Sequence, residues 1–197
     1  MINLPAPDYE SRFALNTALQ LRRSLRDFKD TPLTLSQVGQ LLWAVQGMTS
    51  LGGGRTAPSA GALYPLEIYL VAGNVEELPA GIYKYHSKSH AIAKSLEGDK
   101  RSELAEASLA QGWMTNAPAM IVIAAVYERA TATYGDRGIR YTDMEVGHAA
   151  QNVALEAVAL DLGTVDVGAF SDGAVKKIMR LPAPETPLCI LPVGRGK

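Results

Sequence analysis

The 197-residue chain has few of the residues that build disulfides and metal sites. Its single cysteine, Cys189, excludes an internal disulfide and any cluster of cysteines around a metal. The three histidines, His86, His90 and His148, are scattered along the sequence and give a metal site little to build on. We therefore expect no metal, and we expect a reducing compartment, the cytoplasm, for this protein.

An excess of one charge and a long apolar run are also missing. The chain has 19 basic and 20 acidic residues, a formal net charge of -1, whereas a nucleic-acid binder normally carries a marked basic excess. The most apolar segment, residues 117–126, is half as long as a membrane span requires. The first residues lack the basic and apolar regions of a signal peptide. We expect a soluble protein that binds neither nucleic acid nor membrane.

What is present is an ordinary globular composition, 47% hydrophobic and 20% charged, in a chain long enough for one good-sized core. Apolar periodicity predicts helices and strands that alternate without a strict β-α-β period, which favours an α+β layered sandwich in one domain, residues 1–197. The predicted strands are 66–72, 81–85, 90–96, 120–126, 164–169 and 187–193.

Helix signals accompany these strands. A helix from Phe13 runs into a group of arginines, and a second begins at Thr34 with a capping box to Gln37 and ends at Gly47. A long helix over residues 140–162, ended by Gly163, has apolar positions on more than one stripe, so we expect it to be largely buried, at a subunit interface. The last helix is capped by Ser171 or Asp172.

Three arginines, Arg22, Arg23 and Arg26, surround the hydroxyl of Ser24. Guanidinium groups this close repel one another unless an anion lies between them, and phosphate matches their planar set of donors. The alternative is a solvated basic helix end, where arginine offsets the helix dipole. The segment by itself leaves both interpretations open.

A loop of small residues, 52–65, leads into the strand at 66–72. Loops with so little side chain let backbone amides approach a ligand closely. Pro58 and Pro65 stiffen the loop, which favours a binding loop over a flexible linker.

Four motifs in this order resemble the nitroreductase-fold flavoproteins. The segment Arg22–Phe28 (Arg-Arg-Ser-Leu-Arg-Asp-Phe) is similar to their N-terminal signature, and residues 57–67 resemble the variant in the SagB-type dehydrogenase branch. Residues 147–152 with 163–170 match that branch's long helix and following loop, and residues 191–195 resemble its C-terminal strand. Each motif alone is modest, and together they are specific.

The resemblance implies a three-layer α-β-α sandwich with a mainly antiparallel sheet, and a homodimer that binds FMN at its interface. The FMN phosphate and ribityl chain would contact Arg22, Arg23, Ser24, Arg26, Gly194 and Arg195. The loop of the partner subunit would reach the flavin through Pro58, Ser59, Ala60 and Leu63. The backbone N–H of Gly168, flanked by Val167 and Ala169, would lie near flavin N5 and help to position it for hydride transfer.

Some residues depart from the family pattern. Ala62 and Tyr64 stand where classical nitroreductases have Asn and Gln, so polar contacts to the flavin ring would be lost or re-made. Asp161 and Asp166 stand where the branch more often has Gly and Pro. An acidic Asp166 just before the Gly168 loop would alter the flavin potential or the choice of substrate.

Other polar residues have two interpretations each. Tyr141, Glu145 and His148 share one face of the long helix; Tyr141 and Glu145 are catalytic candidates, and a structural role for His148 is the simpler account. Lys84 beside Tyr85 is either a proton donor or an exposed lysine on a strand. We interpret Cys189 as a buried packing residue. Two interpretations remain open for a group of three arginines, which either steer a substrate or lie in a solvated loop: Arg129, Arg137 and Arg140.

The resulting expectation is an FMN-dependent oxidoreductase in which NAD(P)H reduces the flavin and a nitroaromatic or quinone then takes the electrons. Two alternatives remain, a SagB-type oxidation of azoline rings to azoles in a modified peptide, and a flavin-binding protein without its own acceptor. Outside flavins, the arginines could bind another phosphate-bearing ligand.

Overall fold

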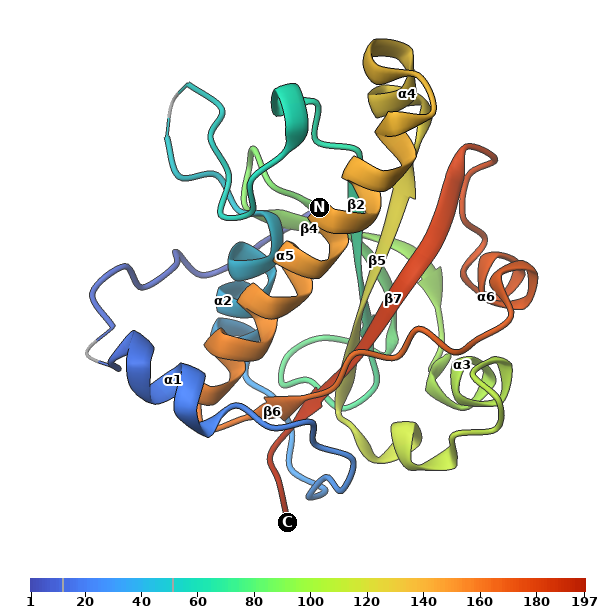
Figure 1. Ribbon diagram of the computed structural model, residues 1–197. Helices are drawn as coiled ribbons and strands as arrows, with labels where there is room; N and C mark the ends of the chain where they lie inside the picture. The colour runs from blue at the N-terminus through green and yellow to red at the C-terminus, as the bar shows by residue number, and fades with distance from the viewer. Residues whose placement is uncertain (12, 51) are drawn as a thin grey trace.

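A seven-stranded sheet forms the centre of the computed structural model, which describes residues 1–11, 13–50 and 52–197 (Figure 1). The strand order is β1-β4-β3-β2-β5-β7-β6, and every pair of neighbours is antiparallel. The strands are β1 (Ile2–Asn3), β2 (Leu66–Ala72), β3 (Gly81–His86), β4 (Ala91–Glu97), β5 (Ala119–Val126), β6 (Gly163–Thr164) and β7 (Glu185–Gly194).

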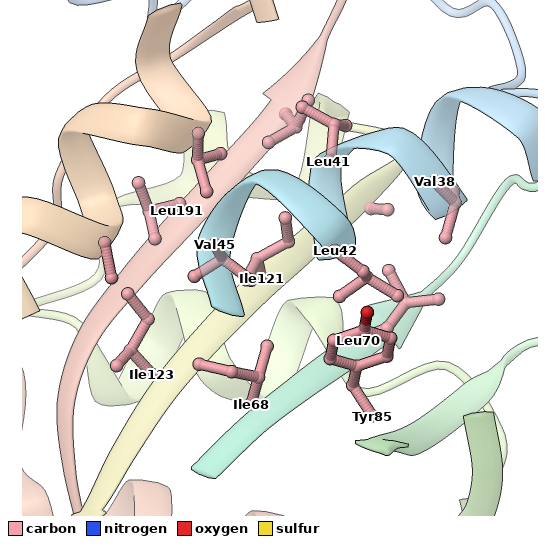
Figure 2. Packing of buried hydrophobic residues seen from close by; sticks show 14 of the residues in the cluster. Val38, Leu41, Leu42, Val45, Ile68, Leu70, Tyr85, Ile121, Ile123 and Leu191 are labelled. Carbon is pink, nitrogen blue, oxygen red and sulfur yellow. The ribbon is translucent and has the colours of Figure 1, made fainter. Parts of the chain in front are cut away.

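Both faces of the central strands are covered, which explains their continuous apolar sequence. Along β2, Ile68 and Leu70 point to one side of the sheet, whereas Tyr69 and Val71 point to the other. The first side packs against α2 (Leu35–Gln46) and α5 (Arg137–Ala159), and Figure 2 shows the α2 side chains over this face. The second side packs against α3 (Arg101–Ala107) and α6 (Asp172–Met179). The expected three-layer α+β sandwich is confirmed.

The shorter helices flank these layers. They are α1 (Leu15–Leu21), α4 (Glu128–Tyr134) and the 3-10 turns η1 (Ala60–Ala62) and η2 (Gly112–Asn116). No helix in the described ranges has the length and apolar character needed to cross a membrane.

The start and end of α2 confirm the sequence signals. Thr34 Oγ1 accepts a hydrogen bond from the Gln37 N–H at 3.2 Å, and Gln37 Oε1 accepts one from the Thr34 N–H at 3.0 Å. This reciprocal capping box satisfies two backbone donors that the helix itself cannot pair. At the other end Gly47 is the C-cap residue.

The long helix differs from its prediction in bounds and burial. It covers Arg137–Ala159 and ends before Gly163, because Asp161 already adopts a left-handed conformation with φ 57°. Gly163 instead lies in β6, where a Cβ atom would stand 2.6 Å from Leu25 Cδ2. The face of α5 that points away from the sheet is exposed in the single chain, where Ile139 is 46% and Met144 is 54% exposed. Within one chain α5 is therefore not largely buried, contrary to the prediction.

Two further corrections concern local structure. Arg129, Arg137 and Arg140, for which a solvated loop was one interpretation, lie on helices instead, Arg129 on α4 and the other two on α5. The strand expected over 164–169 is reduced to Thr164, the second residue of β6, and an isolated bridge between Val167 and Ile190.

Candidate functional site

The arginine segment is extended instead of lying on the last turn of α1, which ends at Leu21. Ser24 bridges Thr164 of β6, and the Leu25 N–H donates to the Thr164 carbonyl at 3.0 Å. Farther along, the Lys29 N–H donates to the Arg195 carbonyl at 2.8 Å. These contacts bring the two ends of the chain to one edge of the sheet, as the resemblance implies for a shared phosphate site.

The three guanidinium groups have different surroundings. Arg23 Nη1 donates to the carbonyls of Gln20 at 2.9 Å and of Arg22 at 2.7 Å, so it caps the C-terminal end of α1. Arg26 lies over the Trp113 ring at 5.9 Å. Within the described ranges neither Arg22 nor Arg26 forms an ion pair. The helix-end interpretation therefore holds for Arg23, and the other two remain available to an anion.

Both acidic departures from the family pattern lie beside these arginines. Arg195 Nη1 is 3.1 Å from Asp161 Oδ2, in an exposed ion pair. Desolvation raises the pKa of Asp166, and the charge of Arg22 opposes this rise. The chain thus supplies two carboxylates of its own to a cationic edge.

The Gly168 turn is fixed on one side and open on the other. Val167 and Ile190 exchange two backbone hydrogen bonds, at 2.9 and 3.0 Å, which attach this turn to β7. Gly168 is exposed, its N–H has no backbone partner among the described residues, and a Cβ atom placed there would meet nothing within 4 Å. From Ile190 to Gly194 the strand advances roughly 13 Å. Gly168 follows the residue bridged to Ile190, and Arg195 follows Gly194, so the open N–H and Arg195 lie near opposite ends of this span.

The loop around Ser59 adopts a strained and well-supported conformation. Ala62 and Tyr64 have φ angles of 54° and 47°, which side-chain-bearing residues seldom adopt. Ser59 Oγ accepts from the Tyr64 N–H at 2.9 Å, and Arg129 Nη1 donates to the Tyr64 carbonyl at 3.0 Å. Such strain persists only where surrounding contacts determine the conformation, and it concentrates at functional sites. The loop is therefore built into one shape, contrary to a flexible linker.

The two catalytic candidates of α5 lie beside this loop. Glu145 is 3% exposed and accepts a hydrogen bond from Gln46 Nε2 at 3.1 Å. Burial raises the pKa of Glu145, while hydrogen bonds to Ser59 and Gln46 oppose the rise. Tyr141 packs edge-on against Tyr134, with ring centroids 5.2 Å apart. Glu145 thus supports the loop, whereas Tyr141 packs against α4.

Residues outside the predicted set complete this support. Arg55 Nη1 donates to Gln46 Oε1 at 3.0 Å, and its guanidinium lies 4.2 Å from the centre of the Tyr64 ring. Arg129 also pairs with Glu67. No spacing in the sequence indicates these contacts, because Arg55 and Arg129 reach them from different elements.

The environments of Lys84 and His148 contradict the simplest interpretations of these residues, an exposed lysine and a structural histidine. Lys84 is not an exposed lysine, since its Nζ lies 2.8 Å from Glu67 and 2.7 Å from Glu185, whose side chain is buried. His148 is exposed and forms no hydrogen bond to a described residue, so it is not a buried structural histidine. Cys189 is buried as expected, and burial raises the pKa of its thiol to about 12.

The segment after α1 that carries Arg22, Ser24 and Arg26, together with Arg195, is called the clamp here, and it lies at the other end of α5 from the Ser59 loop (Figure 1). The loop contacts the helix at Glu145, whereas Arg195 pairs with Asp161 just beyond its C-terminal end. The helix rises about 21 Å from Glu145 to its last residue, Ala159. Pro58, Ala60 and Leu63 belong to the first group, and Gly194 belongs to the second. No group of three or more potential ligands in the described part of the chain is placed to hold a metal.

Comparison with known proteins decides the family. The sequence profile of the Nitroreductase family matches residues 19–195. The chain belongs to the nitroreductase family. A protein of Methanocaldococcus jannaschii with a provisional nitroreductase name is 46% identical over 194 residues, 98% of this chain and 96% of that protein.

Two further relatives match different shares of this chain and of their own length. A crystal structure with a provisional nitroreductase name, from Ralstonia eutropha JMP134, superposes with a TM-score of 0.85 at 30% identity, covering 100% of this chain and 89% of that chain. The microcin B17-processing protein McbC of Escherichia coli is 29% identical over 142 residues. That match covers 64% of this chain and 48% of McbC, so this chain spans about half the length of that relative.

Proposed function

We propose that this nitroreductase-family protein is an FMN-dependent oxidoreductase that uses NAD(P)H to reduce a small nitroaromatic or quinone. The observation that carries the proposal is the edge where the segment of Arg22, Ser24 and Arg26 meets Arg195, with the open Gly168 N–H farther along β7. Bound FMN would take a hydride from NAD(P)H and pass two electrons to the acceptor, with protons drawn from solvent.

The residues present fit this cofactor. Arg22 and Arg26 have no carboxylate partner among the described residues, and the Arg195 pair with Asp161 is exposed and exchangeable. Each charge-assisted hydrogen bond to phosphate contributes roughly 1.5–3 kcal/mol before desolvation and ordering costs. The Gly168 N–H would hold N5 by donating a hydrogen bond to it. The chain therefore supplies binding and orientation, and needs no nucleophile of its own.

The site requires a second copy of the chain in this proposal. One chain holds the clamp and the Ser59 loop at different ends of α5, whereas a two-fold pairing with antiparallel α5 helices would place one chain's loop beside its partner's clamp. Several exposed apolar side chains support this pairing, since α1 and α5 carry Leu15, Leu19, Leu21, Ile139 and Met144. Gly147, in the interior of α5, has open space around it and would let another helix approach closely.

The purified protein tests the proposal directly. We expect it to be yellow and to release FMN on denaturation, and we expect anaerobic NADH or NADPH to bleach the flavin. Addition of a quinone should then restore the colour. A colourless protein that FMN cannot reconstitute would show that the cofactor proposal is wrong, and flavin that nicotinamides cannot bleach would indicate a passive binder.

A second candidate function rests on the similarity to McbC. It is the two-electron oxidation of an azoline ring in a modified peptide to an azole, with bound FMN as acceptor and dioxygen as the final oxidant. Incubation of an azoline-containing peptide with the flavin-loaded protein would show a mass loss of about 2 Da per ring if this activity is present. Reduction of quinone without any change in the peptide would favour the first function.

A further inference from the structure

A second cationic cavity lies behind the Ser59 loop, away from the clamp arginines. Its volume is about 190 Å³, and it is lined by Arg55, Glu67, Lys88 and Arg129 together with residues from β2 and the end of β3. Three cations and one carboxylate give this lining a formal charge of +2. The proposed flavin site does not use these cations.

The single carboxylate of the cavity is already engaged. Glu67 pairs with Arg129 through Oε1 and with Lys84 through Oε2 at 2.8 Å. Lys84 is in turn shared with Glu185. Both carboxylate oxygens of Glu67 therefore have cation partners, and neither forms an ion pair with Arg55 or Lys88 among the described residues.

Arg55 is held in place with donors to spare. Its Nη1 bonds to the fully buried Gln46, and its plane is held by the Tyr64 ring. No acceptor among the described residues bonds to its Nε or Nη2. Partial burial lowers the pKa of Arg55, the charges of Tyr64, Glu145 and Glu67 oppose this change, and the nearby charge of Arg129 adds a smaller lowering. Two guanidinium groups in one small cavity favour an anion between them.

We propose that this cavity binds the carboxylate or phosphate group of a small molecule, with Arg55 as its main donor and Arg129 and Lys88 beside it. The preorganised fork of Arg55 suits a planar carboxylate or two phosphate oxygens. The volume admits one such group, either free or at the end of a larger molecule whose remainder stays outside the cavity. This binding does not depend on flavin.

Calorimetric titration of the flavin-loaded protein with inorganic phosphate, acetate and phenyl phosphate tests this site. Saturable binding is expected, and Arg55→Gln should weaken it at least about tenfold, the loss of one or two charge-assisted hydrogen bonds. Lys88→Gln, an exposed change that leaves the Arg55 contacts intact, should weaken it about threefold. Tighter binding of phenyl phosphate than of free phosphate would indicate that the group belongs to a larger molecule.

Two controls separate the cavity from the cofactor site. Lys177→Gln removes an exposed cation on α6 and should leave anion binding unchanged. Arg195→Ala should weaken FMN binding but not anion binding in the cavity. If the protein proves to bind no flavin, the same titrations in an Arg195→Ala background still isolate the cavity. Absence of saturable binding in wild type, or equal affinities in wild type, Arg55→Gln and Lys88→Gln, would overturn the proposal.

Discussion

Asp161 connects a backbone conformation to the charge of the candidate cofactor site. Its left-handed φ of 57° ends α5 and directs its carboxylate to Arg195. Asp is one of the few side-chain-bearing residues that adopt this conformation readily, so it can replace the Gly that the branch more often has here. The replacement adds a negative charge where a phosphate is expected, and that charge must compete with the cofactor.

Arg195→Ala is expected to weaken FMN binding roughly ten- to a hundredfold, the loss of one charge-assisted contact. The side chain is 46% exposed, so the free energy of unfolding should change little. Fluorescence titration with FMN and urea denaturation measure the two quantities. Asp161→Asn is the matched control, because it removes the same ion pair but keeps the arginine. It should bind FMN as tightly as wild type or a few-fold more tightly.

Two glycines of the same region should respond oppositely to alanine. Gly163→Ala places a Cβ atom 2.6 Å from Leu25 Cδ2 and 3.0 Å from its Cβ, so it should destabilise the fold by about 1–3 kcal/mol. Gly168→Ala meets open space and should leave the unfolding midpoint unchanged, while anaerobic bleaching by NAD(P)H slows at least about tenfold because the added methyl group would keep the flavin from approaching the N–H. Normal bleaching by Gly168→Ala would contradict the N5 assignment.

Residues whose role depends on neighbours in sequence could be predicted, and residues whose role depends on distant partners could not. Arg22 and Ser24 belong to a compact motif, and their shared edge with Arg195 followed from the family resemblance. Arg55 and Lys84 gave no such signal. The Lys84 partner Glu185 is 101 residues away, so only the folded sheet brings them together.

At the scale of elements, local chemistry predicted α2 and the central strands well. The capping box of Thr34 and the continuous apolar run of β5 are both local signals. The end of α5 was misplaced because Asp161, not a glycine, adopts the left-handed conformation. The helix α4 was missed because only Ala130 in it is buried, so it has little apolar periodicity.

Four elements are joined by a network of charges that no single element reveals. Glu67 on β2 pairs with Lys84 on β3 and Arg129 on α4, while Lys84 also reaches Glu185 on β7, which accepts a hydrogen bond from the Tyr69 hydroxyl at 2.6 Å. Burial acts to raise the pKa of Glu67, but its hydrogen bonds and cations outweigh this and lower it. Removing one partner of such a group is costly, because another charge is left unpaired.

The lowered pKa of Glu67 gives the network a defined pH dependence. A carboxylate whose folded pKa lies below its unfolded value of 4.5 stabilises the fold above that pH and loses this contribution as pH falls through the folded pKa. As the pH is lowered below about 4.5, the denaturation midpoint of wild type should therefore decrease. The midpoint of Glu67→Gln should decrease less steeply over the same pH range. Glu106→Gln, an exposed control, should follow wild type. Equal slopes in all three proteins would contradict this assignment.

At the scale of the whole molecule, the exposed apolar side chains of α1 and α5 predict a dimer on which cofactor binding depends. Met144→Glu puts a charge on the exposed face of α5 and should yield a species of one chain, 21.0 kDa, in sedimentation at low concentration. This variant should lose FMN although every proposed contact residue is retained. Leu109→Glu, the same kind of change at an exposed site outside α5, should leave assembly and FMN content unchanged. A Met144→Glu monomer that retains flavin would contradict the composite site.

The clamp and the Ser59 loop lie at different ends of α5, sixteen residues apart when counted from Glu145 to Asp161. This separation has a genetic consequence. Arg195→Ala damages the clamp and Pro58→Glu damages the loop, so each allele alone should yield a protein that binds little FMN. In a mixed dimer one site would carry both lesions and the other neither. Co-expression of the two alleles should therefore restore one flavin per mixed dimer, seen as the return of yellow colour, whereas sites contained within single chains would show no such complementation.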